Sequence, residues 1–247
     1  MSKSPANRKK QMTLDMGQKS LGLKQCKECQ MIYNLDDEQD SEVHSKYHKQ
    51  QESILKFSSW KNEKVVYEYE NLGRCIVIES DIDPKVQITK ALNLLKYVDT
   101  QLGIRNSTQI LNEIDNKIAK ASGQKQRAST NEGNPCKYYL FVSKSNRIVG
   151  FCLAEQLNES HRIRKFSAES DEENAYKNVI CGISRVWVAE TYRRNKIATK
   201  LLDCVRDNFL YFQSLRLNQI AFSDPTENGR QFASKYFKTN EFYIYFK

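Results

Sequence analysis

The chain has 247 residues, 39% of them hydrophobic, which is enough for one sizeable core or for one core and a small accessory module. Its formal net charge of +9 favours anionic partners such as nucleic acid, chromatin or a phosphorylated cofactor, without choosing among them. No apolar run approaches the ~18 residues needed to cross a bilayer, and the first 15 residues lack the apolar segment of a secretory signal. We therefore expect an intracellular protein that makes no membrane contact.

Residues 1–22 are polar, show no clear period and are predicted to form a flexible basic tail. Within it, residues 8–10 are consistent with a nuclear import signal, although three basic residues fit a solvated tail equally well. The seven cysteines are an odd number and no export signal accompanies them, so a disulfide framework is not expected. Five of them are predicted to be reduced thiols, mostly packed as small hydrophobes: Cys75, Cys136, Cys152, Cys181 and Cys204.

Residues 23–55 contain a pattern typical of a zinc finger. Cys26 and Cys29 form a Cys-x2-Cys pair, and His44 and His48 follow at the i, i+4 spacing that places both imidazoles on one face of a short helix. Two thiolates and two imidazoles are a tetrahedral donor set that zinc prefers. A module this small needs a metal to be stable, so we predict a structural Zn²⁺. The alternatives are a chance grouping and a redox Cys-x-x-C motif, which needs no paired histidines.

The spacing and charge of this finger speak against a role in reading DNA. A base-reading finger usually has about 12 residues between the two pairs and occurs in arrays, whereas this finger is single and its gap is 14 residues. The gap carries five carboxylates, which oppose docking on phosphates: Asp36, Asp37, Glu38, Asp40 and Glu42. We therefore favour a structural or protein-contacting finger.

Residues 56–247 are predicted to form the main domain. Strands are expected in two hairpins and a helix between them, followed by a strand, a helix and two further strands. Polar insertions are expected near 105–134 and 158–178. The strands alternate with helices around one sheet, which predicts an α/β (α+β) class. The predicted ranges are 64–70, 74–79, 137–143, 147–157, 180–188, 217–222 and 241–246 for strands, and 84–102 and from about 196 for helices.

The turn from Tyr192 to Ala198 lies between a predicted strand and a predicted helix. Apolar residues recur every fourth position from Ile197 onward, as a sheet-facing stripe would. The N–H groups at a helix N-terminus and the helix dipole form an anion site, and Arg193 and Arg194 come directly before it. A pyrophosphate fits this site, and so does an ordinary basic turn before an amphipathic helix.

The turn resembles the pyrophosphate loop of Gcn-related acetyltransferases, whose pattern is Arg/Gln-x-x-Gly-x-Gly/Ala. Arg193 and Ala198 match this pattern, but Lys196 stands where the pattern has Gly. Because Gly permits close backbone approach, Lys196 is a departure from the general superfamily.

Further segments resemble the cohesin acetyltransferases, the enzymes that establish sister-chromatid cohesion. The resemblance covers nearly the whole chain except the two polar insertions. It implies a mixed sheet flanked by helices, with the zinc finger in front. The segments that carry it are QMTLDMGQKSLG (11–22), CGISRVWV (181–188), RRNKIATKLLD (193–203), AFSDPT (221–226) and FASKYF (232–237).

By this resemblance, the chain transfers an acetyl group from acetyl-CoA to lysines of a cohesin ATPase-head subunit, in the nucleus and on chromatin. Two alternatives remain open: a non-catalytic zinc-finger chromatin adaptor, which the departure at Lys196 favours, and an acetyltransferase for another amine acceptor, because a fold does not fix its acceptor. The Gln-x-x-Leu spacing of Gln11 and Leu14 also resembles the start of a box that binds a replication sliding clamp. The usual aromatic pair is missing from it, and a plain tail is the alternative.

The resemblance also implies roles for individual residues. Ser184, Asp203 and Asp224 are implied for catalysis. Asp224 precedes Pro225, which favours an extended backbone, although a turn-forming Asp is the alternative. A carboxylate with an ordinary pKa of about 3.9 is a poor base for an ammonium, so such a residue needs an upward shift or acts by orienting the lysine. The residues implied for acetyl-CoA are Val186, Trp187, Val188, Arg193, Arg194, Asn195, Lys196, Ile197, Ala198, Thr199, Asp224, Pro225 and Thr226.

The other two implied catalytic residues have simpler explanations. Asp203 lies nearly opposite the apolar stripe of its predicted helix, where a solvated carboxylate is expected. Ser184 fits an ordinary strand position equally well. Both are kept as candidates because of the resemblance.

Overall fold

The computed structural model describes residues 22–26, 29, 31–104, 135–166 and 178–246, which divide into two compact units. The units are Met1–Glu52 and Ser53–Lys247. Residues 1–21 of the predicted tail, including the possible clamp-binding segment Gln11–Leu14, lie outside the described residues, as do 105–134 and much of 158–178. None of the helices in the described ranges is both long and apolar enough to cross a membrane.

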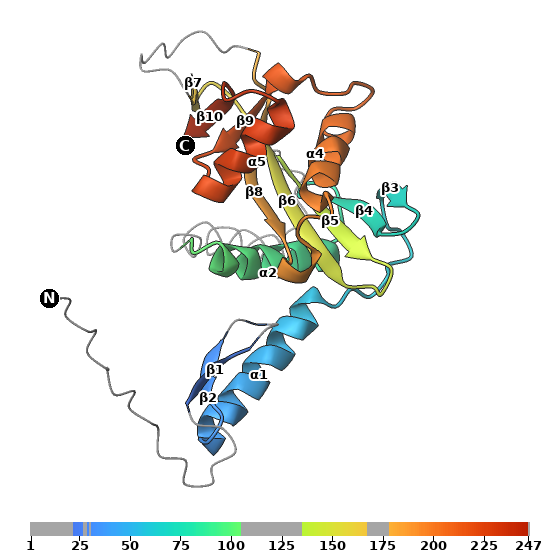
Figure 1. Ribbon diagram of the computed structural model, residues 1–247. Helices are drawn as coiled ribbons and strands as arrows, with labels where there is room; N and C mark the ends of the chain where they lie inside the picture. Colours follow the sequence, from blue (N-terminus) through green and yellow to red (C-terminus); the bar gives the residue numbers. More distant parts are fainter. Residues whose placement is uncertain (1–21, 27–28, 30, 105–134, 167–177, 247) are drawn as a thin grey trace, which may run out of the picture. The chain divides into compact units, whose positions relative to one another are not determined.

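The first unit contains a small hairpin and most of one long helix (Figure 1). Strands β1 (Leu23–Gln25) and β2 (Ile32–Asn34) pair antiparallel, and helix α1 (Glu38–Leu55) follows. The helix begins where the Asp37 carboxylate accepts the backbone N–H of Gln39 at 2.8 Å, which satisfies one of the free donors of the first turn. At 18 residues it is longer than the short helix that the His spacing predicted.

The second unit is built on one eight-stranded mixed sheet (Figure 1). The strand order is β3-β4-β5-β6-β8-β9-β10-β7. Only the pairs β8–β9 and β9–β10 are parallel, and the other neighbours are antiparallel. The predicted α/β (α+β) class is confirmed. The strands are β3 (Val65–Tyr69), β4 (Gly73–Glu79), β5 (Cys136–Ser143), β6 (Ile148–Gln156), β7 (Arg162–Lys165), β8 (Cys181–Val188), β9 (Ile220–Ser223) and β10 (Tyr243–Phe246).

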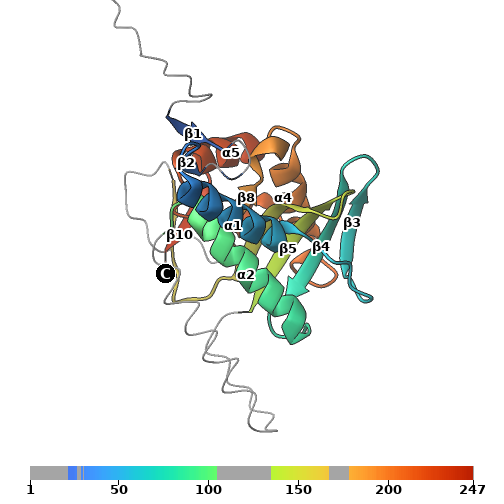
Figure 2. The ribbon, with the colours of Figure 1, turned by 90° about the horizontal axis from the view of Figure 1, so that it is seen from below.

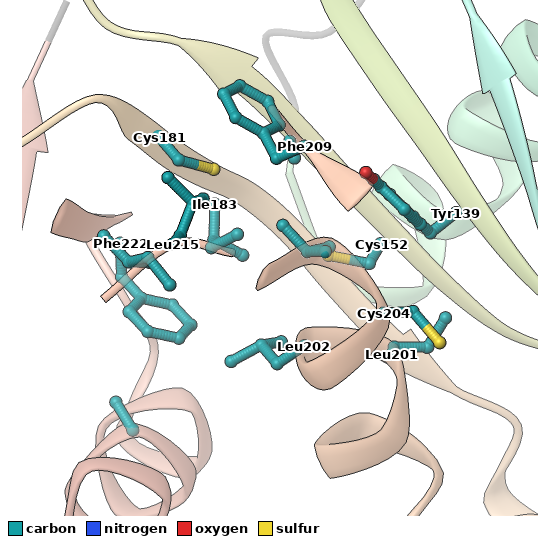
Figure 3. Packing of buried hydrophobic residues seen from close by; sticks show 14 of the residues in the cluster. Tyr139, Cys152, Cys181, Ile183, Leu201, Leu202, Cys204, Phe209, Leu215 and Phe222 are labelled. Carbon is teal, nitrogen blue, oxygen red and sulfur yellow. The ribbon is translucent and has the colours of Figure 1, made fainter. Parts of the chain in front are cut away.

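Each face of this sheet is covered by helices (Figures 1 and 2). Helix α2 (Lys85–Gln101) packs on one face, and α4 (Ile197–Asn208) and α5 (Glu227–Phe237) pack on the other. Successive side chains of β5 point to opposite faces of the sheet, so Tyr138 packs with α2, whereas Tyr139 packs with α4. Figure 3 shows the hydrophobic cluster on the face covered by α4 and α5, in which Leu201 and Leu202 of α4 meet Cys152 and Ile183 of the sheet.

The structure confirms both predicted hairpins, the helix at 84–102, the strand at 180–188 and the helix that starts near residue 196. It corrects the strand predicted at 217–222, because Leu217–Gln219 is a 3-10 turn and the strand runs from Ile220 to Ser223. The Gln219 carboxamide accepts the backbone N–H of Arg216 at 2.8 Å and so closes this turn. Helix α5 was not predicted, and strand β7 falls inside the predicted insertion 158–178.

Candidate functional site

The candidate site is the opening between strands β8 and β9, where the pairing of the two strands stops. These parallel strands are paired only from Cys181 to Ile183, opposite Ile220 to Phe222. Beyond Ile183, β8 continues to Val188 and stays paired with β6 on its other side. In the described part of the chain, no strand pairs with the β9-facing edge of β8 past Ile183. The backbone of Val186–Val188 therefore lies at an edge to which an extended ligand can add.

A β-bulge places Ser184 at the point where the two strands separate. Ile183 is opposite Ala154 and Arg185 is opposite Leu153, so Ser184 is the extra residue of β8. Its carbonyl oxygen accepts a hydrogen bond from Ser223 Oγ at 2.8 Å, and Ser223 is the last residue of β9. The bond fixes the distance between the two strand ends. It thereby brings Ser184 close to Asp224, the residue that follows β9.

Asp224 is held by a tightly fixed backbone although its side chain is exposed. Pro225, the next residue, is buried, and its carbonyl oxygen accepts a hydrogen bond from Arg230 Nε at 3.1 Å. The Thr226 hydroxyl caps α5 by accepting the N–H of Gly229 at 3.3 Å. Strand end, proline and helix start therefore fix where the Asp224 carboxylate projects.

The turn before α4 has the geometry of an anion site. Arg194 and Lys196 both have positive φ, 67° and 59°. The turn is tied back to the 3-10 segment Glu190–Tyr192, because Asn195 Nδ2 donates to the carbonyl oxygen of Tyr192 at 3.2 Å. Lys196 is the N-cap residue, and its side chain makes no capping hydrogen bond. The first N–H groups of α4 are thus left without a side-chain cap, as an anion-binding helix start requires.

The backbone explains why the general superfamily has Gly where this chain has Lys196. A left-handed φ costs most residues roughly 1–2 kcal/mol and costs Gly very little. Lys196 therefore adopts the left-handed backbone conformation for which the superfamily uses Gly. Arg193 contributes to the same turn, because its Nε donates to the carbonyl oxygen of Val188 at 3.2 Å.

Close packing holds this turn against the sheet. A Cβ added to Gly150 of β6 would lie 2.8 Å from Ile197 Cγ2 and 3.0 Å from Leu201 Cδ1. Ile197 is buried at the start of α4, whereas Ala198 and Thr199 beside it are half-buried. The glycine therefore lets the N-terminus of α4 approach β6 closely, at the same end of β8 where Trp187 packs edge-on against Tyr97 of α2.

Asp203 lies on α4 and is tied to α5. Its Oδ1 accepts a hydrogen bond from the Tyr236 hydroxyl at 2.8 Å and lies 4.0 Å from Arg206 Nη1. The carboxylate is 48% exposed. Neither partner is among those of Ser184, which is tied to the end of β9 through Ser223. A catalytic role for Asp203 stays a prediction.

The structure brings together most of the predicted zinc ligands in the first unit. The ligand atoms of Cys26, Cys29 and His48 all lie within 4.8 Å of one another. His44 is outside that group, but its Nε2 is buried and has no hydrogen-bond partner, and its ring stacks on Tyr33 with 4.0 Å between centroids. A buried imidazole nitrogen without a partner is costly unless a metal or water satisfies it. The donor set therefore fits zinc, and His44 as the fourth ligand stays a prediction.

Four charged or polar residues near Ser184 were not picked out from the sequence. Arg185 Nε donates to Asp99 Oδ1 of α2 at 2.6 Å, and the Tyr245 hydroxyl donates to Glu155 Oε1 at 2.5 Å. Asp99 is 2% exposed and Glu155 is 8% exposed. The signal in the sequence was a charged residue inside an apolar segment, as Glu155 is in RIVGFCLAEQL.

Comparison with known proteins gives matches over both units. Residues 177–245 match the family described as ESCO1/2 acetyl-transferase, 11–50 match the zinc-finger of acetyl-transferase ESCO, and 108–210 match the acetyltransferase (GNAT) family. The finger match thus includes part of the segment predicted as a tail. The sequence resemblance to the cohesion-establishment acetyltransferases is confirmed.

Individual relatives agree with the family matches. N-acetyltransferase ESCO2 of Danio rerio is 31% identical over 95% of this chain, and N-acetyltransferase ESCO1 of Homo sapiens is 32% identical over 96%. The chain spans only 37% and 27% of the length of these two proteins. N-acetyltransferase ECO1 of Saccharomyces cerevisiae is 29% identical over 91% of this chain, which spans 87% of that protein.

A solved structure with the same fold is that of the xEco2 acetyltransferase domain bound to a K105-CoA conjugate. It has a TM-score of 0.56 and 32% sequence identity, and the match covers 76% of this chain and 99% of that one. The opening between β8 and β9, the anion turn before α4 and the Cys/His group of the finger are thus found in a chain whose sequence and fold both match one family. The chain belongs to the ESCO family of GNAT acetyltransferases, which joins a zinc finger to an acetyltransferase domain.

Proposed function

We propose that this chain transfers an acetyl group from acetyl-CoA to lysine side chains of a cohesin ATPase-head subunit, and so helps to establish sister-chromatid cohesion. The observation that carries the proposal is the opening between β8 and β9. It has an anion turn at one end of β8 and the Ser184–Asp224 pair where the strands separate. The names of the relatives and the CoA conjugate in the xEco2 structure support the cofactor and the cellular role.

Acetyl-CoA supplies an activated thioester, and the chain's own residues supply its binding site. The turn from Arg193 to Thr199 offers backbone N–H groups, the helix dipole and exposed cationic side chains to the pyrophosphate. The free edge of Val186–Val188 offers backbone groups to the extended part of the cofactor. Residues 224–226 border the same opening at the end of β9.

The acceptor lysine requires a negative charge to attract its ammonium and a polar atom to orient it. The exposed Asp224 carboxylate provides the charge, and the Ser184 hydroxyl at the bulge provides the orienting atom. Asp203 remains a further candidate, acting from α4. The zinc at Cys26, Cys29, His44 and His48 has a structural role, because the finger presents no group that the transfer reaction needs.

The two alternatives differ from this proposal in measurable ways. A zinc-finger chromatin adaptor would show no turnover, and an acetyltransferase for another amine would acetylate small amines and leave folded proteins unmodified. We also propose that the protein acts in the nucleus on chromatin. Docking on a sliding clamp through Gln11 and Leu14 stays a prediction, tested by a pull-down in which both residues are changed to Ala.

The test is incubation of the chain with isotope-labelled acetyl-CoA and purified cohesin ATPase heads, followed by mass spectrometry of the heads. The proposal predicts labelled acetyl groups on a small number of lysines, with no label when the heads are replaced by an equally lysine-rich folded protein. Acetyl-CoA binding without any labelled lysine would support the adaptor. Labelled free amines together with unlabelled heads would support an acetyltransferase for another amine acceptor.

A further inference from the structure

The hydroxyl of Ser184 lies near polar side chains that are buried or half-buried. Arg185 Nη1 donates to Ser184 Oγ at 3.2 Å, and the same guanidinium donates from Nε to Asp99 at 2.6 Å. On the other side, Ser184 is among the side chains that act on the hydroxyl of Tyr245, which donates to Glu155 Oε1 at 2.5 Å. These side chains come from four elements: α2, β6, β8 and β10.

The donors and acceptors in this network have fixed roles. A carboxylate only accepts, so the Tyr245 hydroxyl must use its single proton on Glu155. Tyr245 can therefore only accept from Ser184, so a hydrogen bond between the two hydroxyls requires Ser184 to donate its proton. A serine hydroxyl has one proton and two lone pairs, and Arg185 uses one of the lone pairs. One lone pair of Ser184 is left for an incoming donor such as a lysine ammonium.

Gly182 makes this arrangement possible. A Cβ at Gly182 would lie 2.8 Å from Cζ of the Tyr245 ring, the atom that carries the hydroxyl. Gly182 is opposite Glu155 in the β6–β8 ladder. The absence of a side chain at 182 therefore lets the ring of Tyr245 cross β8 and bring its hydroxyl to Glu155. Tyr245 is 1% exposed, so water does not reach this bond freely.

We propose that Ser184, Tyr245 and Glu155 form a proton relay that takes one proton from the acceptor lysine before it attacks the thioester. The relay rests on the proposed acetyltransferase function and adds a destination for the proton. Asp224 faces solvent and holds the ammonium by charge, whereas the relay leads the proton inward. Glu155 and Tyr245 act through Ser184 and are positioning residues; Ser184 is the member that touches the substrate.

The proton balance of the relay is simple. The lysine Nζ–H passes to Ser184 Oγ, the Ser184 proton passes to Tyr245 Oη, and the Tyr245 proton passes to Glu155 Oε1. Only the Glu155 carboxyl ends with one more proton than before, and the lysine becomes a neutral amine. The proton leaves by the same path after the product departs, and no electrons are exchanged. Burial and the nearby Glu155 charge raise the pKa of Tyr245, so its hydroxyl passes a proton on without remaining ionised.

Other titratable or charged groups face this relay, and their effect on the pH profile needs a control. His161 is the histidine among them, and its ring centroid lies 5.8 Å from that of Tyr245. A His161→Gln variant therefore serves as a control for the pH profile. The groups that face Glu155 and Tyr245 are Cys136 and Tyr138 on β5, Cys181 and Arg185 on β8, and His161 before β7.

The test compares acetylation rates of the full chain with those of Glu155→Gln and Tyr245→Phe between about pH 6.5 and pH 9.5. Gln keeps an oxygen that accepts the Tyr245 hydrogen bond but is far too weak a base to take a proton, and Phe keeps the ring over Gly182. We expect each variant to lose at least about tenfold in kcat at neutral pH, with unchanged acetyl-CoA affinity. The deficit should shrink as the pH rises towards the lysine pKa of about 10.4, because more lysine then arrives unprotonated.

Tyr243→Phe is the matched control, since it makes the same substitution on the same strand and should leave the rate unchanged. Variants with kcat within twofold of wild type, or a deficit that is constant across the pH range, would overturn the relay while leaving the acetyltransferase proposal intact. A wild-type chain that binds acetyl-CoA and acetylates nothing would instead overturn the proposed function, and the relay with it. Thermal unfolding is measured beside each rate, and assays are run well below the lowest unfolding temperature.

Discussion

Lys196 occupies a left-handed backbone position, φ 59°, immediately before α4. We predict that Lys196→Gly leaves the free energy of unfolding unchanged or raises it by up to about 1 kcal/mol, because Gly adopts this φ without strain. Lys200→Gly, the same change inside α4, should lower it by about 1 kcal/mol or more. Gly is a poor helix residue, and the contact of the Lys200 ammonium with the Tyr69 ring, 4.0 Å from its centroid, is also lost.

Urea unfolding of the two variants measures this difference. Equal destabilisation by the two substitutions would mean that the turn before α4 does not hold Lys196 in the left-handed conformation. Acetyl-CoA affinity measured by calorimetry adds a second readout. Lys196→Gly keeps the backbone N–H groups of the turn, so any loss of affinity measures the contribution of the lysine charge alone.

Single residues of the site differ in how far the sequence could identify them. Ser184 and Asp224 were found because SRVWV and SDPT resemble a family, and the structure adds the Ser223–Ser184 bond that brings them together. Tyr245 and Glu155 are 90 residues apart in sequence. Their pairing depends on a strand order in which β10 follows β9, and no local pattern contains that information. An acidic residue inside an apolar strand was the only available signal.

The packing of α4 on the sheet depends on Gly150 of β6. We predict that Gly150→Ala lowers stability by about 1–3 kcal/mol, because the new methyl group would overlap Ile197 and Leu201. The same displacement moves the N-terminus of α4, so acetyl-CoA should also bind more weakly. The measurement is thermal unfolding together with calorimetric titration of acetyl-CoA.

Gly229→Ala in α5 provides the control for this change. Its added methyl group would meet Pro225 Cβ at 3.1 Å, a looser contact than the 2.8 Å found at Gly150, and Ala is favoured over Gly in a helix. It should therefore leave stability nearly unchanged. If Gly150→Ala were equally mild, the close approach of α4 to β6 would not be what fixes the anion turn.

At the level of elements, sequence periodicity predicted the strands and helices that bury one face. It did not predict a helix whose start is marked only by an N-cap residue. The hairpin strands alternate clearly between the two sides of the sheet, and the apolar stripe of α4 recurs every fourth residue. Helix α5 was missed because the loop SDPTENG runs into it without a break. Its start depends on Thr226 as a cap, and the apolar side of α5 is short. Strand β7 is only four residues long and pairs with β10, at the far end of the chain.

The whole molecule consists of two units whose stability has different origins. The first unit, Met1–Glu52, contributes a single buried hydrophobic residue to the described core, Cys29, whereas the second contains three hydrophobic clusters. Burial raises the pKa of the Cys29 thiol, so binding of zinc must displace its proton. The first unit should therefore depend on the metal, and the second should not.

We predict that a strong zinc chelator removes about one metal ion per chain and opens the first unit to protease, while the sheet and the helices of the second unit stay resistant. Cys29→Ala should give the same cleavage pattern without chelator, and Cys136→Ala, a thiol of the second unit, should not. Metal analysis and limited proteolysis read these outcomes. Full zinc occupancy in Cys29→Ala would contradict the ligand assignment.

The central claim is that a lysine is acetylated at the opening between β8 and β9, and Asp224→Asn tests it most directly. The measurement is the initial rate of lysine acetylation, with acetyl-CoA affinity and thermal unfolding determined on the same samples. Asn keeps the size of Asp but has no charge for the ammonium, so the rate should fall about 10²-fold or more at unchanged affinity and stability. Asp207→Asn, an exposed carboxylate on α4, should have little effect. An Asp224→Asn rate within a few-fold of wild type would contradict the account.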